Sequence, residues 1–79
     1  MVVNILFFGS TAEIAGTRNL DRHCEDVETV SDLICKLSMD YPALANHKLL
    51  FAINEEYADP NTLLKDGDEI AVFTAVSGG

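Results

Sequence analysis

The sequence predicts an α+β domain in which a mixed β-sheet wraps around one main helix. Three observations predict this class: one strongly amphipathic helical segment, four strand-like segments around it, and the position of the two most apolar strands at opposite ends of the chain. A chain of 79 residues has room for a single small domain and excludes a second catalytic domain.

The first third of the chain contains two predicted strands and a short helix. Residues 2–8 (VVNILFF) are an apolar run that ends at Gly9-Ser10, which predicts a buried, central strand. Residues 11–19 contain a short helical stretch, and Gly16 is its natural end. Residues 20–27 are polar enough for an edge strand, which we expect to run antiparallel to the first.

The clearest helix of the sequence begins after Thr29. The Thr29 hydroxyl can cap its first turn, and Asp32 stands where a capping box places its acidic residue. Asp32 and Lys36 have the spacing of an ion pair on one helix face, and Pro42 requires the helix to end by Tyr41. The apolar residues at helical spacing are Val30, Leu33, Ile34, Leu37 and Tyr41.

The second half of the chain reads as strands separated by turns. Residues 48–54 and 69–75 are predicted strands, Glu55-Glu56 is a predicted turn into Tyr57-Ala58, and residues 59–61 form another turn. Gly67, within Asp-Gly-Asp, suits a turn that needs a positive φ. We expect the first and last strands to lie parallel at the centre of the sheet. This is a ubiquitin-like β-grasp architecture, with a domain over residues 1–75 and a flexible functional tail over residues 76–79.

Strand alternation predicts an exposed aromatic patch on the sheet. If Val3, Ile5 and Phe7 face the helix, Phe8 lies on the opposite face, and Phe73 of the last strand lies beside it. Tyr57 can reach this face from the turn after the third strand. A covering loop or simple tolerance of the rings would also explain the pattern. Exposed aromatic clusters on a small domain favour a protein-docking patch formed by Phe8, Tyr57 and Phe73.

The chain ends in Val76-Ser77-Gly78-Gly79. Two terminal glycines add no packing, so a frayed end is the plain interpretation. The functional interpretation is that residues without Cβ atoms thread a narrow channel and carry the Gly79 carboxylate to a buried active site. Adenylation by ATP would turn that carboxylate into an electrophile for a thiol, a persulfide or an amine.

Charge and composition exclude several functions. The net charge of −8 and the pI near 4.3 disfavour nucleic acid and anionic membranes as partners. The N-terminus has no signal-peptide or membrane-spanning pattern, so we expect a cytoplasmic protein. Cys24 and Cys35 form no disulfide framework, and their spacing to His23 and His47 predicts no metal site.

The chain resembles the small subunits of molybdopterin synthase, the MoaD-type sulfur-carrier proteins, over nearly its whole length. The segments that carry the resemblance are Leu6-Phe7-Phe8, residues 12–16 (AEIAG), Thr29-Val30, residues 41–44 (YPAL), residues 52–54 (AIN), residues 64–73 (LKDGDEIAVF) and residues 76–79 (VSGG). The family usually has two prolines where this chain has Thr74 and Ala75, so this tail should be more flexible or should extend the strand.

The resemblance implies a function. An E1-like, MoeB-type enzyme would adenylate Gly79 with ATP, and sulfur from a cysteine desulfurase would make the Gly79 thiocarboxylate. The tail, Val76 to Gly79, would enter the large, MoaE-type synthase subunit and donate sulfur to cyclic pyranopterin monophosphate. This chain would bind no cofactor itself and would not be catalytic alone. Phe8, Tyr57 and Phe73 match positions through which the family docks partners.

Three alternatives remain open at the level of sequence. A thiamine-type sulfur carrier shares the fold and the Gly-Gly end, although residues 9–19 make this chain longer between its first two strands. A ubiquitin-like modifier would join Gly79 to lysines of target proteins. A domain that only binds other proteins would not need the two C-terminal glycines for its function. Cys24 and Cys35 are interpreted as incidental, because the sequence specifies little around them that would lower a thiol pKa.

Overall fold

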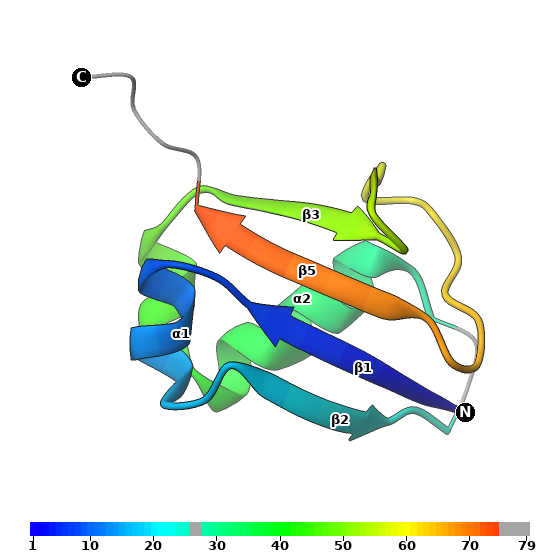
Figure 1. Ribbon diagram of the computed structural model, residues 1–79, viewed down its shortest axis with the longest axis horizontal. Coiled ribbons are helices and arrows are strands. Elements are labelled where there is room, and N and C mark those ends of the chain that lie inside the picture. The colour runs from blue at the N-terminus through cyan, green and yellow to red at the C-terminus, as the bar shows by residue number, and fades with distance from the viewer. Residues whose placement is uncertain (26–27, 75–79) are drawn as a thin grey trace.

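The computed structural model describes residues 1–25 and 28–74, which form one five-stranded sheet with the main helix packed across one side of it and a short helix at one end (Figure 1). The strand order is β2-β1-β5-β3-β4. The strands are β1 (Val2–Phe7), β2 (Asn19–His23), β3 (Leu49–Ile53), β4 (Glu56–Tyr57) and β5 (Glu69–Thr74). The helices are α1 (Ser10–Ala15), α2 (Val30–Asp40) and the short 3-10 helix η1 (Pro42–Asn46).

The two most apolar strands lie side by side in the sheet, as predicted. β1 and β5 pair in parallel, with Ile5 opposite Ile70 and Phe7 opposite Val72. The other pairings are antiparallel, and β2 is an edge strand beside β1. β2 ends at His23, earlier than the predicted residue 27. The mixed sheet around one main helix confirms the β-grasp prediction.

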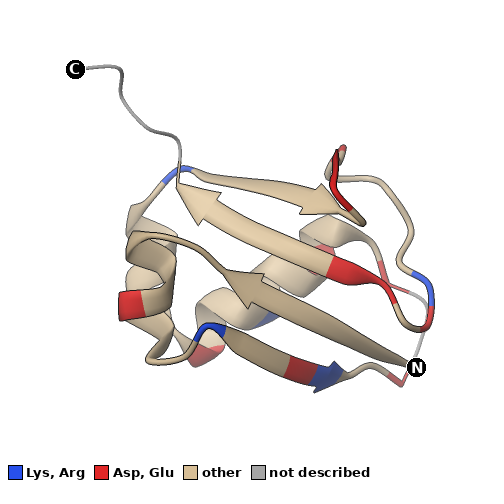
Figure 2. Cartoon of the chain, in the orientation of Figure 1, with Lys and Arg blue, Asp and Glu red and all other residues tan. Residues whose placement is uncertain are grey.

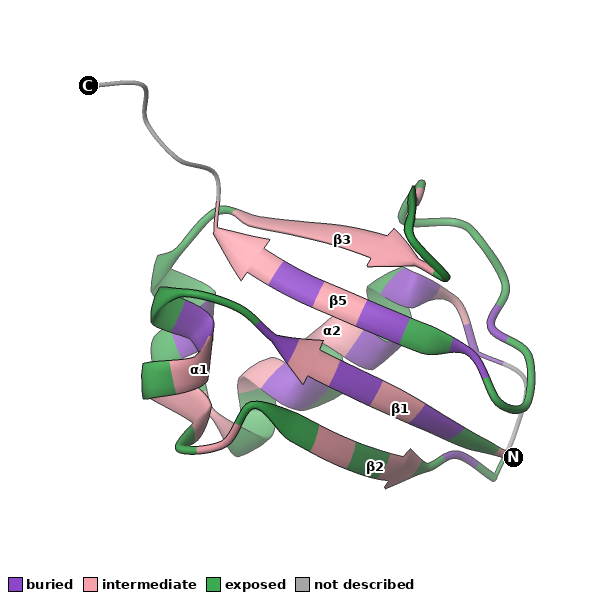
Figure 3. Cartoon of the chain, in the orientation of Figure 1, coloured by how far each residue is buried: buried purple, intermediate pink, exposed green. Residues whose placement is uncertain are grey.

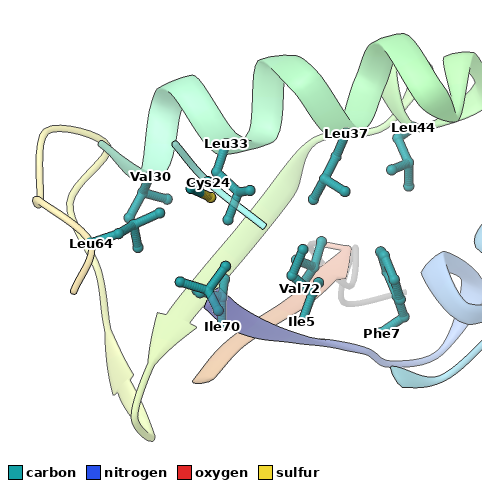
Figure 4. Packing of buried hydrophobic residues seen from close by; sticks show 11 residues of the cluster. Ile5, Phe7, Cys24, Val30, Leu33, Leu37, Leu44, Leu64, Ile70 and Val72 are labelled. Atoms are coloured by element: carbon teal, nitrogen blue, oxygen red, sulfur yellow. The ribbon is translucent and has the colours of Figure 1, made fainter. Parts of the chain in front are cut away.

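The core fills the space between α2 and the sheet (Figure 4). Alternate residues of β1 and β5 are buried, which appears as alternating bands along these strands in Figure 3. Burial of apolar surface is the main stabilising contribution in a domain of this size. The buried apolar residues are Val3, Ile5, Phe7, Cys24, Val30, Leu33, Leu37, Leu44, Leu64, Ile70 and Val72.

The predicted capping box at the start of α2 is present. The Asp32 backbone N–H donates to the Thr29 hydroxyl at 3.2 Å, and the Thr29 N–H donates to the Asp32 carboxylate at 3.1 Å. The predicted Asp32–Lys36 ion pair is wrong, because the Lys36 ammonium instead contacts Glu28. Asp32 is held by the cap at the helix end, and Lys36 lies beside the buried Glu28 carboxylate.

The turn after β3 lies one residue earlier than predicted. Asn54 and Glu55 have φ values of 49° and 72°, and Glu56 already belongs to β4. Two consecutive positive φ values form a tight two-residue hairpin connection, which matches the twist of the flanking strands. The predicted Gly67 turn is confirmed, with φ at 85°. Within residues 1–25 and 28–74, no helix has the length and apolar character needed to cross a membrane.

Candidate functional site: the open face of the sheet

The side of the sheet opposite α2 carries an apolar surface, here called the open face. Strand register defines it, because directly paired residues point to the same side. Leu50 pairs with Phe73, and Ala52 pairs with both Ala71 and Tyr57. Its residues are Leu6, Phe8, Leu50, Ala52, Tyr57, Ala71 and Phe73, all partly or fully exposed. Helices on one side of a sheet leave its other side uncovered (Figure 1).

The three predicted docking aromatics divide into a contacting pair and a third ring on another strand. Tyr57 is 81% exposed, and its ring centroid lies 6.1 Å from that of Phe73. Phe8 follows the last residue of β1 and is 51% exposed, and its backbone N–H donates to the Val72 carbonyl at 3.0 Å. All three residues therefore lie at accessible positions, but only the rings of Tyr57 and Phe73 contact each other.

The first turn of α1 forms hydrogen bonds with the ends of both β1 and β5. Thr11 is fully buried, and its hydroxyl lies 2.6 Å from the Phe8 carbonyl and 3.0 Å from the Val72 carbonyl. The Ser10 and Thr74 hydroxyls lie 3.3 Å apart. Because these contacts hold the final residues of β5 against α1, they set the place from which the remaining five residues of the chain begin.

A shallow groove of about 810 Å³ borders the open face beside α1. Its lining combines the end of β1 with α1 and the residues that lead into β2, including Leu6, Phe8, Ala12, Glu13 and Arg18. At the β2 edge the surface becomes polar, because the Asn4 amide donates to Asn19 and to Asp21 across the sheet. The apolar part of the open face is therefore limited to β1, β5, β3 and β4.

The predicted tail residues, Val76, Ser77, Gly78 and Gly79, lie outside the described residues, as does Ala75. Their roles stay predictions. β5 is described through Thr74 and pairs there with Leu49 at the start of β3. Thr74 thus continues the strand at the position where the resembled family has proline.

Neither cysteine lies on the open face. Cys24 is buried in the core after β2, whereas Cys35 is exposed on α2. Burial raises the pKa of the Cys24 thiol, and the nearby Glu28 carboxylate raises it further. A raised thiol pKa leaves less thiolate, so the environment of Cys24 disfavours nucleophilic chemistry.

The sequence interpretation missed Leu50, Ala52 and Thr11. Leu50 and Ala52 have the same alternation as the other strands, but their face becomes known only from the pairing of β3 with β5. Thr11 lies in the first turn of α1 and has no sequence signal for a buried hydroxyl. Its role depends on the Val72 carbonyl, 61 residues further along the chain.

Comparisons with known proteins identify relatives of this chain. The ThiS family matches residues 5–79. The molybdopterin synthase sulfur carrier subunit of Chlamydomonas reinhardtii is 34% identical over 83 aligned positions, and the alignment covers both chains completely.

Two solved structures share the fold and the length. The small archaeal modifier protein 1 of Methanosarcina acetivorans is 30% identical, with a TM-score of 0.82 and coverage of 99% of this chain and 96% of that one. A chain from the complex of subunits 1 and 2 of the molybdopterin-converting factor of Helicobacter pylori is 28% identical, with a TM-score of 0.69 and full coverage of both chains. The chain belongs to the ThiS family, together with the sulfur carrier subunits of molybdopterin synthase.

Proposed function

We propose that this protein is the sulfur carrier of a molybdopterin synthase and delivers sulfur as a thiocarboxylate on Gly79. The observation that carries the proposal is the end-to-end match to a molybdopterin synthase sulfur carrier subunit, which includes the whole chain. The open face supports it, because a carrier must be recognised by other proteins and this surface is apolar and accessible.

The chemistry takes place on the terminal carboxylate. An E1-like enzyme would use ATP to adenylate Gly79, with release of pyrophosphate. A persulfide, charged by a cysteine desulfurase, would attack the acyl carbon and displace AMP, and a second thiol would cleave the sulfur–sulfur bond to leave the thiocarboxylate. The protein would supply no acid or base of its own. Its described residues hold β5 and present the open face.

The proposed main partner is the large synthase subunit. The Helicobacter pylori relative is in a complex of subunits 1 and 2 of the converting factor, so a chain of this fold forms such an assembly. We propose that Phe8, Tyr57 and Phe73 anchor this complex and that Val76 to Gly79 enter the active site of the large subunit. That site would receive cyclic pyranopterin monophosphate as the sulfur acceptor.

The direct test is the mass of the intact protein and of its fragment ions after expression beside a sulfur-activating system. Replacement of one carboxylate oxygen by sulfur has the same nominal mass change as addition of one oxygen, so oxidation of Met1 or Met39 is a confounder. We expect fragment ions to place the change on Gly79. A matched variant that lacks Gly79 should show no such change. An unmodified Gly79 in the presence of active enzyme would contradict the proposal.

A second function is favoured by one observation, the 30% identity to a small archaeal modifier protein. A modifier uses the same adenylate, but a lysine amine of a target protein attacks it and forms an isopeptide bond. The same mass experiment separates the two. Adducts that join Gly79 to lysines and disappear when Gly79 is deleted would establish the modifier function, and a thiocarboxylate active with the large subunit would establish the carrier function.

A further inference from the structure

The two ends of the sheet differ in charge, which gives a charge gradient along the strands that carry the open face (Figure 2). Arg18 and Lys48 are both exposed, and both lie at the end of the sheet where β5 finishes. The Arg18 carbonyl accepts a hydrogen bond from the Phe7 N–H at 3.0 Å. Lys48 directly precedes Leu49, which pairs with Thr74. The two cations therefore lie on opposite sides of the β1–β5 pair, at the end from which the tail begins.

The opposite end of the same sheet is acidic. Glu55 is exposed in the β3–β4 turn, and Glu69, which pairs with Asn4, is exposed at the first residue of β5 on the open-face side. Glu56 pairs with Ile53 and so lies on the helix-facing side of the sheet. Asp66 and Lys65 are also exposed near this end. Asp68 contributes less negative charge to the surface, because its carboxylate accepts hydrogen bonds from the Asn54 amide at 3.0 Å and from the Lys65 N–H at 2.7 Å.

Ion pairs within the protein do not cancel the charge gradient. Arg22 pairs with Asp40, and Lys36 pairs with Glu28, so these two cations are engaged beside α2 and away from the open face. Glu13 lines the same groove as Arg18 and offsets part of its charge. Even so, the cationic end carries two of the five basic residues of a chain with thirteen acidic ones.

We propose that this gradient fixes the direction in which a partner protein docks on the open face. The partner has an apolar patch bordered by carboxylates where it meets Arg18 and Lys48, and by lysine or arginine where it meets Glu55 and Glu69. Charges around an apolar contact guide the encounter and penalise the reversed orientation. The inference rests on the proposed function, since a reversed complex would point Gly79 away from the partner's active site.

Docking in a direction fixed by the charge gradient, here called the oriented model, makes a prediction opposite to that of attraction by net charge alone. If attraction of a −8 protein to a basic partner were the only electrostatic effect, making the protein more acidic would speed association. In the oriented model, Arg18→Glu with Lys48→Glu places carboxylates against the partner's carboxylates and slows association. Removal of negative charge by Glu55→Lys with Glu69→Lys slows association in both models.

The experiment is stopped-flow association of the full chain with the large synthase subunit of the same organism, at low and at physiological salt. We expect the Arg18→Glu/Lys48→Glu protein to associate about tenfold more slowly at low salt, with a smaller difference at higher salt because of screening. The control is Met39→Glu, since Met39 is exposed on α2 away from the open face, and it should match the unaltered protein. Circular dichroism melts verify that every variant is folded.

The outcomes are separable from failure of the proposed function. Faster or unchanged association of the Arg18→Glu/Lys48→Glu protein, with binding still present, would overturn the oriented model and leave the carrier function standing. No binding by the unaltered protein would overturn both. A lower rate for this variant and for Glu55→Lys/Glu69→Lys, with Met39→Glu unchanged, supports the oriented model.

Discussion

Thr11 shows how one buried hydroxyl can connect distant parts of this fold. The residue is fully buried, and a buried hydroxyl without a partner would destabilise the domain. Its contacts with the Phe8 and Val72 carbonyls meet that requirement and join α1 to the ends of both central strands. Both carbonyls also accept backbone N–H donors, from Thr11 and Phe8 respectively, so each keeps one hydrogen bond if the hydroxyl is lost.

Replacement of Thr11 by valine should therefore lower the free energy of unfolding by about 1 kcal/mol, the typical contribution of one such hydrogen bond. Valine keeps the shape of threonine, so packing should change little. The measurement is urea denaturation followed by circular dichroism. Thr62→Val is the matched control at an exposed position and should shift stability by less than about 0.5 kcal/mol. Equal stability of Thr11→Val and the unaltered protein would show that the hydroxyl contacts contribute nothing.

At the scale of elements, α2 is the helix on which the core depends, and its first turn is stabilised by the capping box. The hydrogen bond from the Thr29 backbone N–H lowers the pKa of Asp32, the Thr29 side chain lowers it further, and Lys36 has a smaller effect in the same direction. A lowered pKa in the folded state means that ionised Asp32 stabilises the fold above its unfolded pKa. That contribution is lost as the pH falls through the folded pKa.

We expect Thr29→Ala to lower the free energy of unfolding by about 1 kcal/mol at neutral pH, because it removes the side-chain acceptor of the cap. The pH dependence is tested with Asp32→Asn. Its deficit relative to the unaltered protein should be largest at neutral pH and should shrink below pH about 4, where the unfolded carboxyl is protonated. Denaturation curves measured from neutral to acidic pH give both results. A deficit that stays constant with pH would contradict the role of the ionised carboxylate.

At the scale of the whole molecule, α2 and the open face lie on opposite sides of the sheet. Tyr57 is 81% exposed, so its ring contributes little to folding. In the proposed complex the ring would become buried and would contribute mainly to binding. The open face can therefore be altered without loss of the fold.

Tyr57→Ser should weaken binding to the large synthase subunit about tenfold or more, in the range of an interface hot spot. Its effect on the free energy of unfolding should stay within about 0.5 kcal/mol. Titration calorimetry and urea denaturation measure the two quantities on the same sample. Met39→Ser, a change at a similarly exposed apolar residue on α2, is the control and should leave affinity unchanged. Equal affinity of the two variants would remove Tyr57 from the docking surface.

Much of the fold follows from local sequence patterns. The apolar run of β1, the helical spacing and cap of α2, and Gly67 in its turn are local features, and each appears where it was predicted. The turn after β3 was misplaced because Asn54 and Glu55 adopt positive φ without glycine. For Glu55 that conformation is unfavourable by itself, so strand pairing on both sides must impose it.

The sequence by itself determined the fold class, the identity of the core strands and the presence of exposed aromatics, because alternation and helical spacing reflect burial at each position. Only the tertiary structure decided which distant residues meet. In the folded chain, Tyr57 contacts Phe73, and Lys36 pairs with Glu28 rather than with Asp32. The Thr11 hydroxyl donates to the Val72 carbonyl. The parallel pairing of β1 with β5 follows from the two apolar strands. The pairing of β5 with β3 and the register of both pairs depend on contacts across long stretches of chain that no local pattern encodes.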